Sequence, residues 1–206
     1  MGAVAVGRVN PAQLDAVTVD AFGTLLTLED PLPRLGALLP NHSASDIERA
    51  FREEGTYYRA NAATGRDAET LATLRESCVR VFNKSLGSTL TADEYVSALE
   101  FSLLPGVIAG LRRLRALGLT IAAVANWDFG LHEHLATAGI DGYFATVVHA
   151  AAKPDPAGIL SALHTVGVRP ERALHIGDER ADEDAARGAG VRFLPAPFSE
   201  AVTSLA

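Results

Sequence analysis

Residues 16–25, with the sequence AVTVDAFGTL, decide how the rest of this chain is interpreted. The first four residues form an apolar, β-branched run, which is typical of a strand buried on both faces of a parallel sheet. The run ends at the acidic residue Asp20, and Gly23 allows a tight turn shortly afterwards. Ligands of an open parallel sheet bind beyond the carboxyl ends of its strands. We therefore expect Asp20 to lie in a functional site.

The second half of the chain alternates short apolar runs with segments of helical periodicity. The runs that predict buried strands are residues 120–124, 145–148, 173–176 and 191–194. The segments that predict helices are residues 105–117, 131–138, 157–166 and 181–189. Strands that alternate with helices of this length indicate βαβ units and a parallel sheet, which the strand at 16–19 most simply joins. We predict an α/β fold with a Rossmann-like, three-layer core.

Between the first strand and this second half lies a stretch that is helical throughout. Ser43 with Asp46, and Thr91 with Glu94, have the spacing of helix N-terminal capping pairs. Apolar residues recur at helical spacing after each pair, and strand signals are absent from about residue 30 to 100. We predict that residues 29–102 form an inserted α-helical cap, and that residues 1–28 and 103–206 form the core.

Composition and charge exclude several classes of protein. The 206 residues include 18 basic and 25 acidic side chains, a net charge of -7 that argues against binding nucleic acid through its phosphates. A single cysteine, Cys78, excludes an intrachain disulfide and a cysteine-rich zinc site. No apolar run approaches the roughly 20 residues that span a bilayer. Residues 1–10 lack the pattern of a secretory signal, and Val6 stands where N-myristoylation at Gly2 needs Ser or Thr.

These observations predict a cytoplasmic protein without nucleic-acid or membrane partners, and they leave open whether it is a monomer or a homodimer. The basic residues carry a further signal, because only Lys84 and Lys153 are lysines and the other sixteen are arginines. A compact ammonium fits between two acids better than a planar guanidinium. Lys153 is therefore a candidate site residue.

Polar residues follow the predicted strands at the edge where ligands bind. Asp178 and Asp182 follow residues 173–176, and they are expected to meet Asp20 and Lys153 there. Three carboxylates and one ammonium leave two uncompensated negative charges, which raise pKa values or recruit a cation. A hard divalent ion such as Mg²⁺ prefers oxygen ligands of this kind. We therefore predict a Mg²⁺ cofactor.

Four segments follow the predicted strands: residues 20–25, 125–128, 153–156 and 177–182. Taken in order, they resemble the motifs of the haloacid dehalogenase (HAD) superfamily, and the helical insertion resembles the cap of its subfamily I. The resemblance implies that Asp20 is a covalent nucleophile and that Lys153 binds the transferring group of a small-molecule substrate. It implies a set of metal ligands: Asp20, the Phe22 backbone carbonyl, Asp178 and Asp182, the last directly or through water. It also implies a set of substrate-binding residues: Gly23, Thr24, Ala125, Asn126 and Lys153.

Two positions depart from the phosphatases of this superfamily. Phe22 stands where they carry a second aspartate that protonates the leaving oxygen and later activates water. Ala125 stands where they carry a Ser or Thr whose hydroxyl binds the anion. General acid–base catalysis contributes roughly 10²–10⁴-fold to rate. Alkyl phosphate esters are therefore expected to be poor substrates.

Three hypotheses follow for the function. The first, which we favour, is a Mg²⁺-dependent phosphatase-like hydrolase of a small phosphorylated metabolite. The second is a 2-haloacid dehalogenase-like hydrolase, because those enzymes resemble this chain at Phe22 and Asn126 and a halide leaves without a proton. The third is a non-catalytic binding or regulatory protein. The histidines His132, His134 and His175 show no evident ligand partners, and core or surface roles are predicted for them.

Overall fold

A computed structural model describes residues 9–205, and its core is a five-stranded parallel sheet. The strand order is β5-β4-β1-β6-β7. The strands are β1 (Ala16–Val19), β4 (Thr120–Val124), β5 (Thr146–Val148), β6 (Ala173–Gly177) and β7 (Arg192–Pro195). The predictions for a signal segment and for Gly2 concern residues 1–8 and lie outside the described residues.

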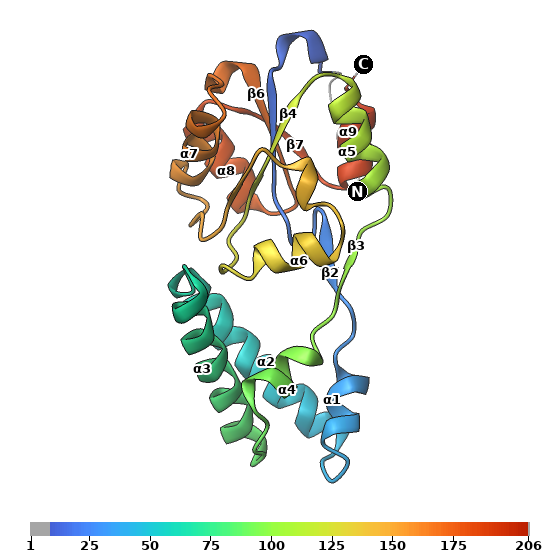
Figure 1. The fold of residues 1–206 in the computed structure, drawn as a ribbon, viewed down its shortest axis with the longest axis vertical. Helices are drawn as coiled ribbons and strands as arrows, with labels where there is room; N and C mark the ends of the chain where they lie inside the picture. The colour runs from blue at the N-terminus through green and yellow to red at the C-terminus, as the bar shows by residue number, and fades with distance from the viewer. Residues whose placement is uncertain (1–8, 206) are drawn as a thin grey trace.

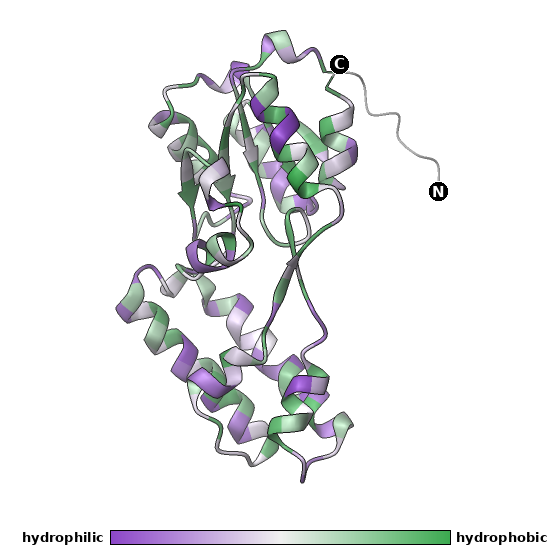
Figure 2. Cartoon of the chain, turned by 45° about the vertical axis from the view of Figure 1, so that its right-hand side comes forward, coloured by the Kyte–Doolittle hydropathy of each residue, from purple (hydrophilic) through white to green (hydrophobic). Residues whose placement is uncertain are grey.

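Helices cover both faces of this sheet (Figure 1). On one face α5 (Val107–Ala116), α6 (Leu131–Thr137) and α9 (Phe198–Thr203) contribute to the larger apolar core. On the other face α7 (Ala157–Thr165) and α8 (Arg180–Ala189) close a second core. The sheet strands are mostly apolar, whereas the helices mix apolar and polar residues, as Figure 2 shows. The predicted three-layer α/β architecture is confirmed.

The segment between β1 and β4 contains a separate helical cluster at one end of the sheet (Figure 1). It comprises α1 (Leu32–Leu38), α2 (Ala44–Asn61), α3 (Ala68–Leu86) and α4 (Ala92–Ser97), which enclose their own apolar core. Ser43 caps α2 and Thr91 caps α4, as the sequence predicts. Helical segments consistent with a cap are therefore present.

Some elements were not predicted from the sequence. Two short antiparallel strands, β2 (Leu26–Leu28) and β3 (Phe101–Leu103), connect the cap to the core, and the predicted boundary between residues 102 and 103 falls inside β3. Helix α9 was also missed. Three-residue strands and a six-residue helix are too short for apolar periodicity to register. Short 3₁₀ helices cover Pro11–Gln13, Ala62–Thr64, Asp141–Tyr143 and Pro170–Arg172. Within residues 9–205, no helix combines the length and the apolar character that a membrane crossing requires.

The apolar core of the cap contains a buried carboxyl group, that of Glu54, which is 5% exposed. The Tyr95 hydroxyl donates a hydrogen bond of 2.8 Å to Glu54 Oε2, and Cys78 is buried in the same helical cluster. Burial raises the pKa of Glu54, and the hydrogen bond from Tyr95 offsets only a part of that rise. The folded protein therefore favours the neutral acid.

This burial makes the stability of the protein depend on pH. A carboxyl whose pKa is raised by folding stabilises the folded state fully below its ordinary value of 4.5, and this contribution is lost as pH rises through the raised pKa. Glu54→Gln keeps an acceptor for Tyr95 but stays neutral. We expect its melting temperature to fall less steeply than that of the wild type as pH rises above 4.5. Parallel profiles would contradict this expectation, and Glu53→Gln, at an exposed position of α2, is the control.

Candidate active site

The carboxyl ends of three neighbouring strands bring the sequence-predicted residues to one edge of the sheet. Strand β1 lies between β4 and β6, so Asp20, Ala125 and Asp178 follow adjacent strands. The Asp20 backbone N–H donates to the Ile176 carbonyl at 2.9 Å, which continues the β1–β6 pairing up to the site. The register of the parallel sheet therefore positions the side chains that sequence analysis selected.

Lys153 reaches this edge from the loop after β5 and is nearly buried. Its Nζ donates to Asp20 Oδ1 at 2.5 Å, to Asp182 Oδ1 at 2.5 Å and to the Val124 carbonyl at 3.0 Å. Burial by itself lowers the pKa of Lys153, but the charges of Asp20 and Asp182 outweigh it and hold that pKa above the usual value. Lys153 is therefore an ammonium ion with three acceptors.

The two carboxylates that share Lys153 differ in their protonation behaviour. Burial raises the pKa of Asp20, and the negative charges of Asp182 and Asp178 add to that rise while Lys153 opposes it. For Asp182, burial also acts to raise the pKa, but the hydrogen bond from His175 and the charge of Lys153 bring it below the usual value. Asp182 is therefore the firmly ionised partner of the ammonium.

Asp178 completes a cluster of three carboxylates. One oxygen each of Asp20, Asp178 and Asp182 lies within 4.8 Å of the others. Burial raises the pKa of Asp178, and the negative charge of Asp182 adds to this effect. One ammonium does not balance three carboxylates, so the cluster retains the excess negative charge that the sequence predicts.

The turn after Asp20 makes room for Asp178. Gly23 has φ +77°, and a Cβ atom at Gly23 would lie 2.2 Å from Asp178 Oδ2. Any other residue would collide with this carboxylate and would also adopt an unfavourable backbone conformation. The buried Thr24 hydroxyl donates to Asp178 Oδ1 at 3.4 Å. The Gly-Thr pair thus holds Asp178, a role that sequence analysis did not assign to it.

The donor set of this cluster suits a hard divalent cation. Asp178 offers a carboxylate at the surface of the pocket, and no backbone hydrogen bond in the described chain uses the Phe22 carbonyl. Asp182 is different, since Oδ1 accepts from Lys153 and His175, and Oδ2 accepts from the Glu179 N–H at 3.0 Å. The residues that could hold Mg²⁺ directly are Asp20, Phe22 through its carbonyl, and Asp178. Asp182, which already accepts three hydrogen bonds, suits an indirect role.

Aromatic side chains form one wall of the pocket. Phe22 is 51% exposed, and its ring meets that of Trp127 edge-on at 6.0 Å between centroids. Trp127 is nearly buried and packs against Phe101 and His134. Phe22 thus presents an apolar surface beside the nucleophile position, and it carries no group that could donate or accept a proton.

Ala125 and Asn126 make contacts other than those predicted for substrate binding. The Ala125 N–H donates to the Val148 carbonyl at 2.9 Å and extends the β4–β5 ladder. The Asn126 amide bonds the backbone of Lys153 twice, accepting from its N–H at 2.7 Å and donating to its carbonyl at 2.8 Å. Asn126 thus anchors the loop that carries Lys153, and substrate binding by these two residues stays a prediction.

Sequence analysis missed one member of this site, His175. Its Nε2 lies 3.2 Å from Asp182 Oδ1, and its Nδ1 lies 2.8 Å from the Thr18 hydroxyl. The sequence does contain a signal that could have identified it: His175 stands in an apolar run that predicts a strand buried on both faces. A polar side chain in such a strand needs hydrogen-bond partners. Thr18 pairs with His175 in the β1–β6 register.

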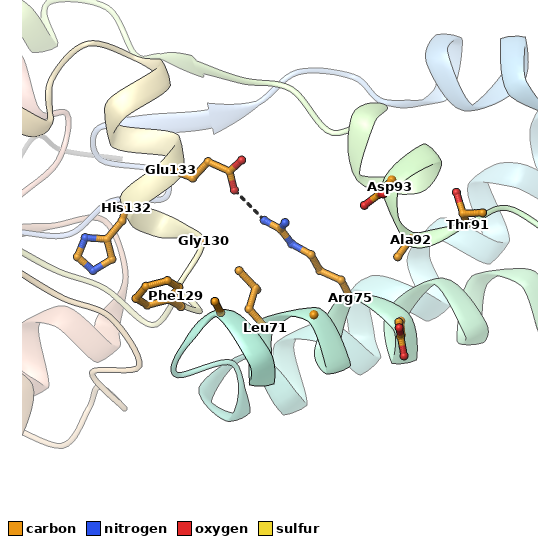
Figure 3. Close-up of a pocket in the computed structure, with 12 residues that line it drawn as sticks. Leu71, Arg75, Thr91, Ala92, Asp93, Phe129, Gly130, His132 and Glu133 are labelled. Carbon is orange, nitrogen blue, oxygen red and sulfur yellow. Dashed lines mark hydrogen bonds and ion pairs between the residues drawn. The ribbon is translucent and has the colours of Figure 1, made fainter.

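Two pockets lie near this end of the sheet. The smaller, of about 80 Å³, contains the acidic cluster, Lys153 and the aromatic wall. The larger, of about 790 Å³, lies between α3 and α4 of the cap and α6 of the core, where Arg75 donates to Glu133 at 3.1 Å (Figure 3). None of the predicted site residues lines the larger pocket, which we interpret as a gap between cap and core.

The fold and this arrangement of acids define a class of enzyme. The sequence model described as "haloacid dehalogenase-like hydrolase" matches residues 14–190. The chain belongs to this family, and the predicted resemblance is confirmed. It is accordingly a hydrolase.

The proteins that this chain resembles include both phosphatases and dehalogenases. The chain is 29% identical over 200 residues to the phosphoglycolate phosphatase of Thiobacillus denitrificans, covering 91% of this chain and 85% of the relative. The L-2-haloacid dehalogenase of Xanthobacter autotrophicus has a TM-score of 0.64 and 23% identity, covering 87% and 76% of the two chains. A HAD family enzyme of Bacteroides thetaiotaomicron, solved with magnesium and inorganic phosphate, has a TM-score of 0.65 and 14% identity, covering 88% and 93%. At such identities the two structures show the fold alone.

Proposed function

We propose that this hydrolase is a Mg²⁺-dependent phosphatase that acts on a small phosphorylated metabolite through Asp20. The observation that carries the proposal is the position of Asp178 against Asp20 in a cluster with excess negative charge. Asp20, the Phe22 carbonyl and Asp178 would hold the ion, which would neutralise charge on the phosphoryl group. The name of the Thiobacillus denitrificans relative supports release of phosphate rather than of halide.

The residues of the chain have distinct tasks in this reaction. Lys153 engages Asp20 Oδ1, which leaves Oδ2 to attack phosphorus. A bond forms between Asp20 and phosphorus as the bond to the leaving oxygen breaks, and that oxygen departs with the electron pair. Water then attacks phosphorus as the bond between Asp20 and phosphorus breaks, and Asp20 departs as a carboxylate with the electron pair. The proton of the water passes to an oxygen of the released inorganic phosphate, because Phe22 cannot accept it. Lys153 stabilises the negative charge of the phosphoryl oxygens throughout.

Phe22 restricts the leaving group. An alkoxide is a poor leaving group unless an acid protonates it, and the side chain at position 22 cannot do so. A carboxylate leaves as a stable anion, so acyl phosphates need no such acid. We propose that acyl phosphates, and other esters with acidic leaving groups, are hydrolysed faster than alkyl phosphates by roughly the 10²–10⁴-fold that general acid catalysis contributes.

We further propose that residues 29–102 act as a cap that closes the pocket against water and selects the substrate. Two contacts between cap and core support this role: the Phe129 N–H donates to the Gly65 carbonyl at 2.7 Å, and Arg75 pairs with Glu133. Water exclusion strengthens electrostatic interactions at the reacting atoms. The cytoplasmic location stays a prediction from the sequence.

Phe22 also favours a second candidate, hydrolysis of a carbon–halogen bond. A halide leaves without a proton, and the aromatic wall of Phe22 and Trp127 suits an apolar substrate. Asp178 argues against it, because a cation bound between Asp178 and Asp20 would weaken the attack of Asp20 on carbon. We therefore rank this candidate second.

One panel of assays separates these candidates. Phosphate release is measured from acetyl phosphate, from 4-nitrophenyl phosphate and from an alkyl ester, glycerol phosphate, with Mg²⁺ and with a chelator, beside chloride release from 2-chloropropionate. We expect Mg²⁺-dependent phosphate release, faster from acetyl phosphate than from an alkyl phosphate. Chloride release that persists with the chelator would support the dehalogenase instead. Absence of both activities would contradict both candidates.

Binding of Mg²⁺ is expected to be visible without any substrate. An ion that binds only the folded state stabilises it by about 2.7 kcal/mol at a hundred times its dissociation constant. We expect Mg²⁺ to raise the melting temperature of the wild type but not that of Asp178→Asn. Without metal, the variant should melt at a higher temperature than the wild type, because one carboxylate of the cluster is removed. An equal Mg²⁺ response of both proteins would contradict the site, and Asp141→Asn, on an exposed 3₁₀ helix, is the control.

A further inference from the structure

His175 lies completely buried beneath the site, and the proposed chemistry gives it no task. It belongs to β6, in which every residue is buried. A polar side chain in such a place costs free energy unless its hydrogen-bonding groups are paired. Both ring nitrogens of His175 have a partner, and the two partners belong to different elements of the core.

The partners connect the histidine to the reacting groups. Nδ1 lies 2.8 Å from the hydroxyl of Thr18, on the strand that leads to Asp20. Nε2 lies 3.2 Å from Asp182 Oδ1, on the first turn of α8. The same oxygen of Asp182 accepts from Lys153 Nζ, which also contacts Asp20. A continuous chain of hydrogen bonds therefore runs from Thr18 to Asp20 through His175, Asp182 and Lys153.

These contacts specify which nitrogen of His175 carries the proton. The Asp182 carboxylate is only an acceptor, so Nε2 must be the donor. Nδ1 of a neutral ring is then an acceptor. The Thr18 hydroxyl, which also lies 3.4 Å from the Leu174 carbonyl, directs its single proton to Nδ1 at the shorter distance of 2.8 Å. A second positive charge on the ring is disfavoured, because the Lys153 ammonium already shares Asp182 Oδ1. The network is thus satisfied by the neutral Nε2–H tautomer.

Asp182 has little freedom once these contacts form. The Glu179 N–H occupies Oδ2, and a Cβ atom at Gly177 would lie 2.3 Å from Asp182 Cγ. The carboxylate therefore lies directly over the Gly177 backbone, with His175 and Lys153 donating to one oxygen. Removing the His175 donor leaves Lys153 as the sole partner of that oxygen among the described residues, so the orientation of the carboxylate that holds Lys153 is less tightly fixed.

We propose that His175 is a positioning residue, whose Nε2–H fixes the Asp182 carboxylate that holds Lys153 against Asp20. Thr18 acts one step further back, since its hydroxyl selects the tautomer that can donate to Asp182. The expected effect of His175 on the rate of phosphate release rests on the proposed function. The assignment of the Nε2–H tautomer does not. Mutation of a residue that orients a catalytic or metal-binding side chain through a hydrogen bond typically lowers activity by about 10–100-fold.

Nuclear magnetic resonance tests the tautomer without an assay of activity. In protein labelled with ¹⁵N-histidine, two-bond ¹H–¹⁵N correlations distinguish a protonated nitrogen from an unprotonated one. We expect His175 to show a proton on Nε2 and none on Nδ1, with and without Mg²⁺. Thr18→Val should shift the Nδ1 resonance, because its hydrogen bond is lost. A proton on Nδ1 of the wild type would overturn the proposal.

Two amides of similar polarity test the effect on rate. His175→Gln can place an amide donor near the position of Nε2, whereas His175→Asn can reach only the side of Thr18. We expect His175→Asn to lower kcat by about 10–100-fold with little change in KM, and His175→Gln to recover at least fivefold of that loss. Equal kcat values for two folded variants would overturn the positioning role.

A control variant separates loss of positioning by His175 from a general loss of stability. Tyr95→Phe removes a buried hydrogen bond in the cap, and we expect it to lower the melting temperature while kcat is unchanged. If it lowers kcat as much as His175→Asn does, loss of stability explains both and the positioning role is refuted. If the wild type releases no phosphate at all, the proposed function fails, and the resonance experiment still decides the tautomer.

Discussion

Replacing Asp20 with asparagine is expected to reduce Mg²⁺-dependent phosphate release by about 10⁴-fold or more, as loss of a covalent nucleophile does in other hydrolases. The amide has nearly the same shape as the carboxylate but cannot form the bond to phosphorus. Initial rates with acetyl phosphate at saturating Mg²⁺ provide the measurement. The loss should appear in kcat, because substrate contacts outside Asp20 are retained.

Asp20→Asn is also expected to stay folded. Lys153 keeps Asp182 and the Val124 carbonyl as acceptors when Asp20 becomes an amide. Asp155→Asn, an exposed acid just after Lys153, is the matched control and should retain full activity. If folded Asp20→Asn keeps more than a tenth of the wild-type rate, another residue attacks phosphorus and the mechanism is wrong.

Lys153→Met is expected to affect activity and stability together. Breaking a buried ion pair by removing one partner costs about 3–5 kcal/mol, because the remaining charge loses its compensation. Here two buried carboxylates, Asp20 and Asp182, lose their shared ammonium. Urea denaturation followed by circular dichroism measures the change. Added Mg²⁺ should recover a part of the lost stability, because a cation in the acidic cluster replaces part of the missing positive charge.

The other lysine of the chain provides the control for this experiment. Lys84 is exposed on α3, so Lys84→Met should change stability by less than about 0.5 kcal/mol. Comparable free energies of unfolding for the two methionine variants would show that Lys153 does not compensate the cluster. Lys153→Arg tests shape, since a planar guanidinium is expected to fit between the two acids less well than an ammonium.

Local patterns were sufficient for most of the architecture. The strands of the parallel sheet other than β7 are mostly apolar runs with a nearby turn signal, and each predicted helix of the second half has an apolar stripe. These signals arise because burial on both faces of a strand, or on one face of a helix, constrains every residue of the element. The paired strands β2 and β3 escaped prediction because three residues carry no period, and their partners lie far apart in the chain.

The residues that carry charge were also recognisable before the structure. Asp20, Lys153, Asp178 and Asp182 each follow a predicted strand or its loop, and the rule that ligands bind at the carboxyl ends of strands brings them together. Sequence analysis likewise identified the loss of an acid at Phe22. It also predicted a substrate-binding role for Asn126, which stays a prediction, but it did not predict that the Asn126 amide bonds the backbone of Lys153.

The amino-acid sequence thus specifies most helices and strands, the acidic cluster and the lysine that belongs to it. It does so because apolar periodicity and the ends of strands are local properties of the sequence. The distribution of hydrogen bonds among these groups is not local. Thr24 meets Asp178, His175 meets Asp182 and Asn126 meets Lys153 through pairings across 154, 7 and 27 positions of sequence. Such contacts depend on sheet register and on where α8 begins. They decide which acid has an oxygen available for attack and which one holds the lysine: within residues 9–205 the Asp20 carboxylate accepts only from Lys153, through Oδ1, whereas both oxygens of Asp182 accept hydrogen bonds.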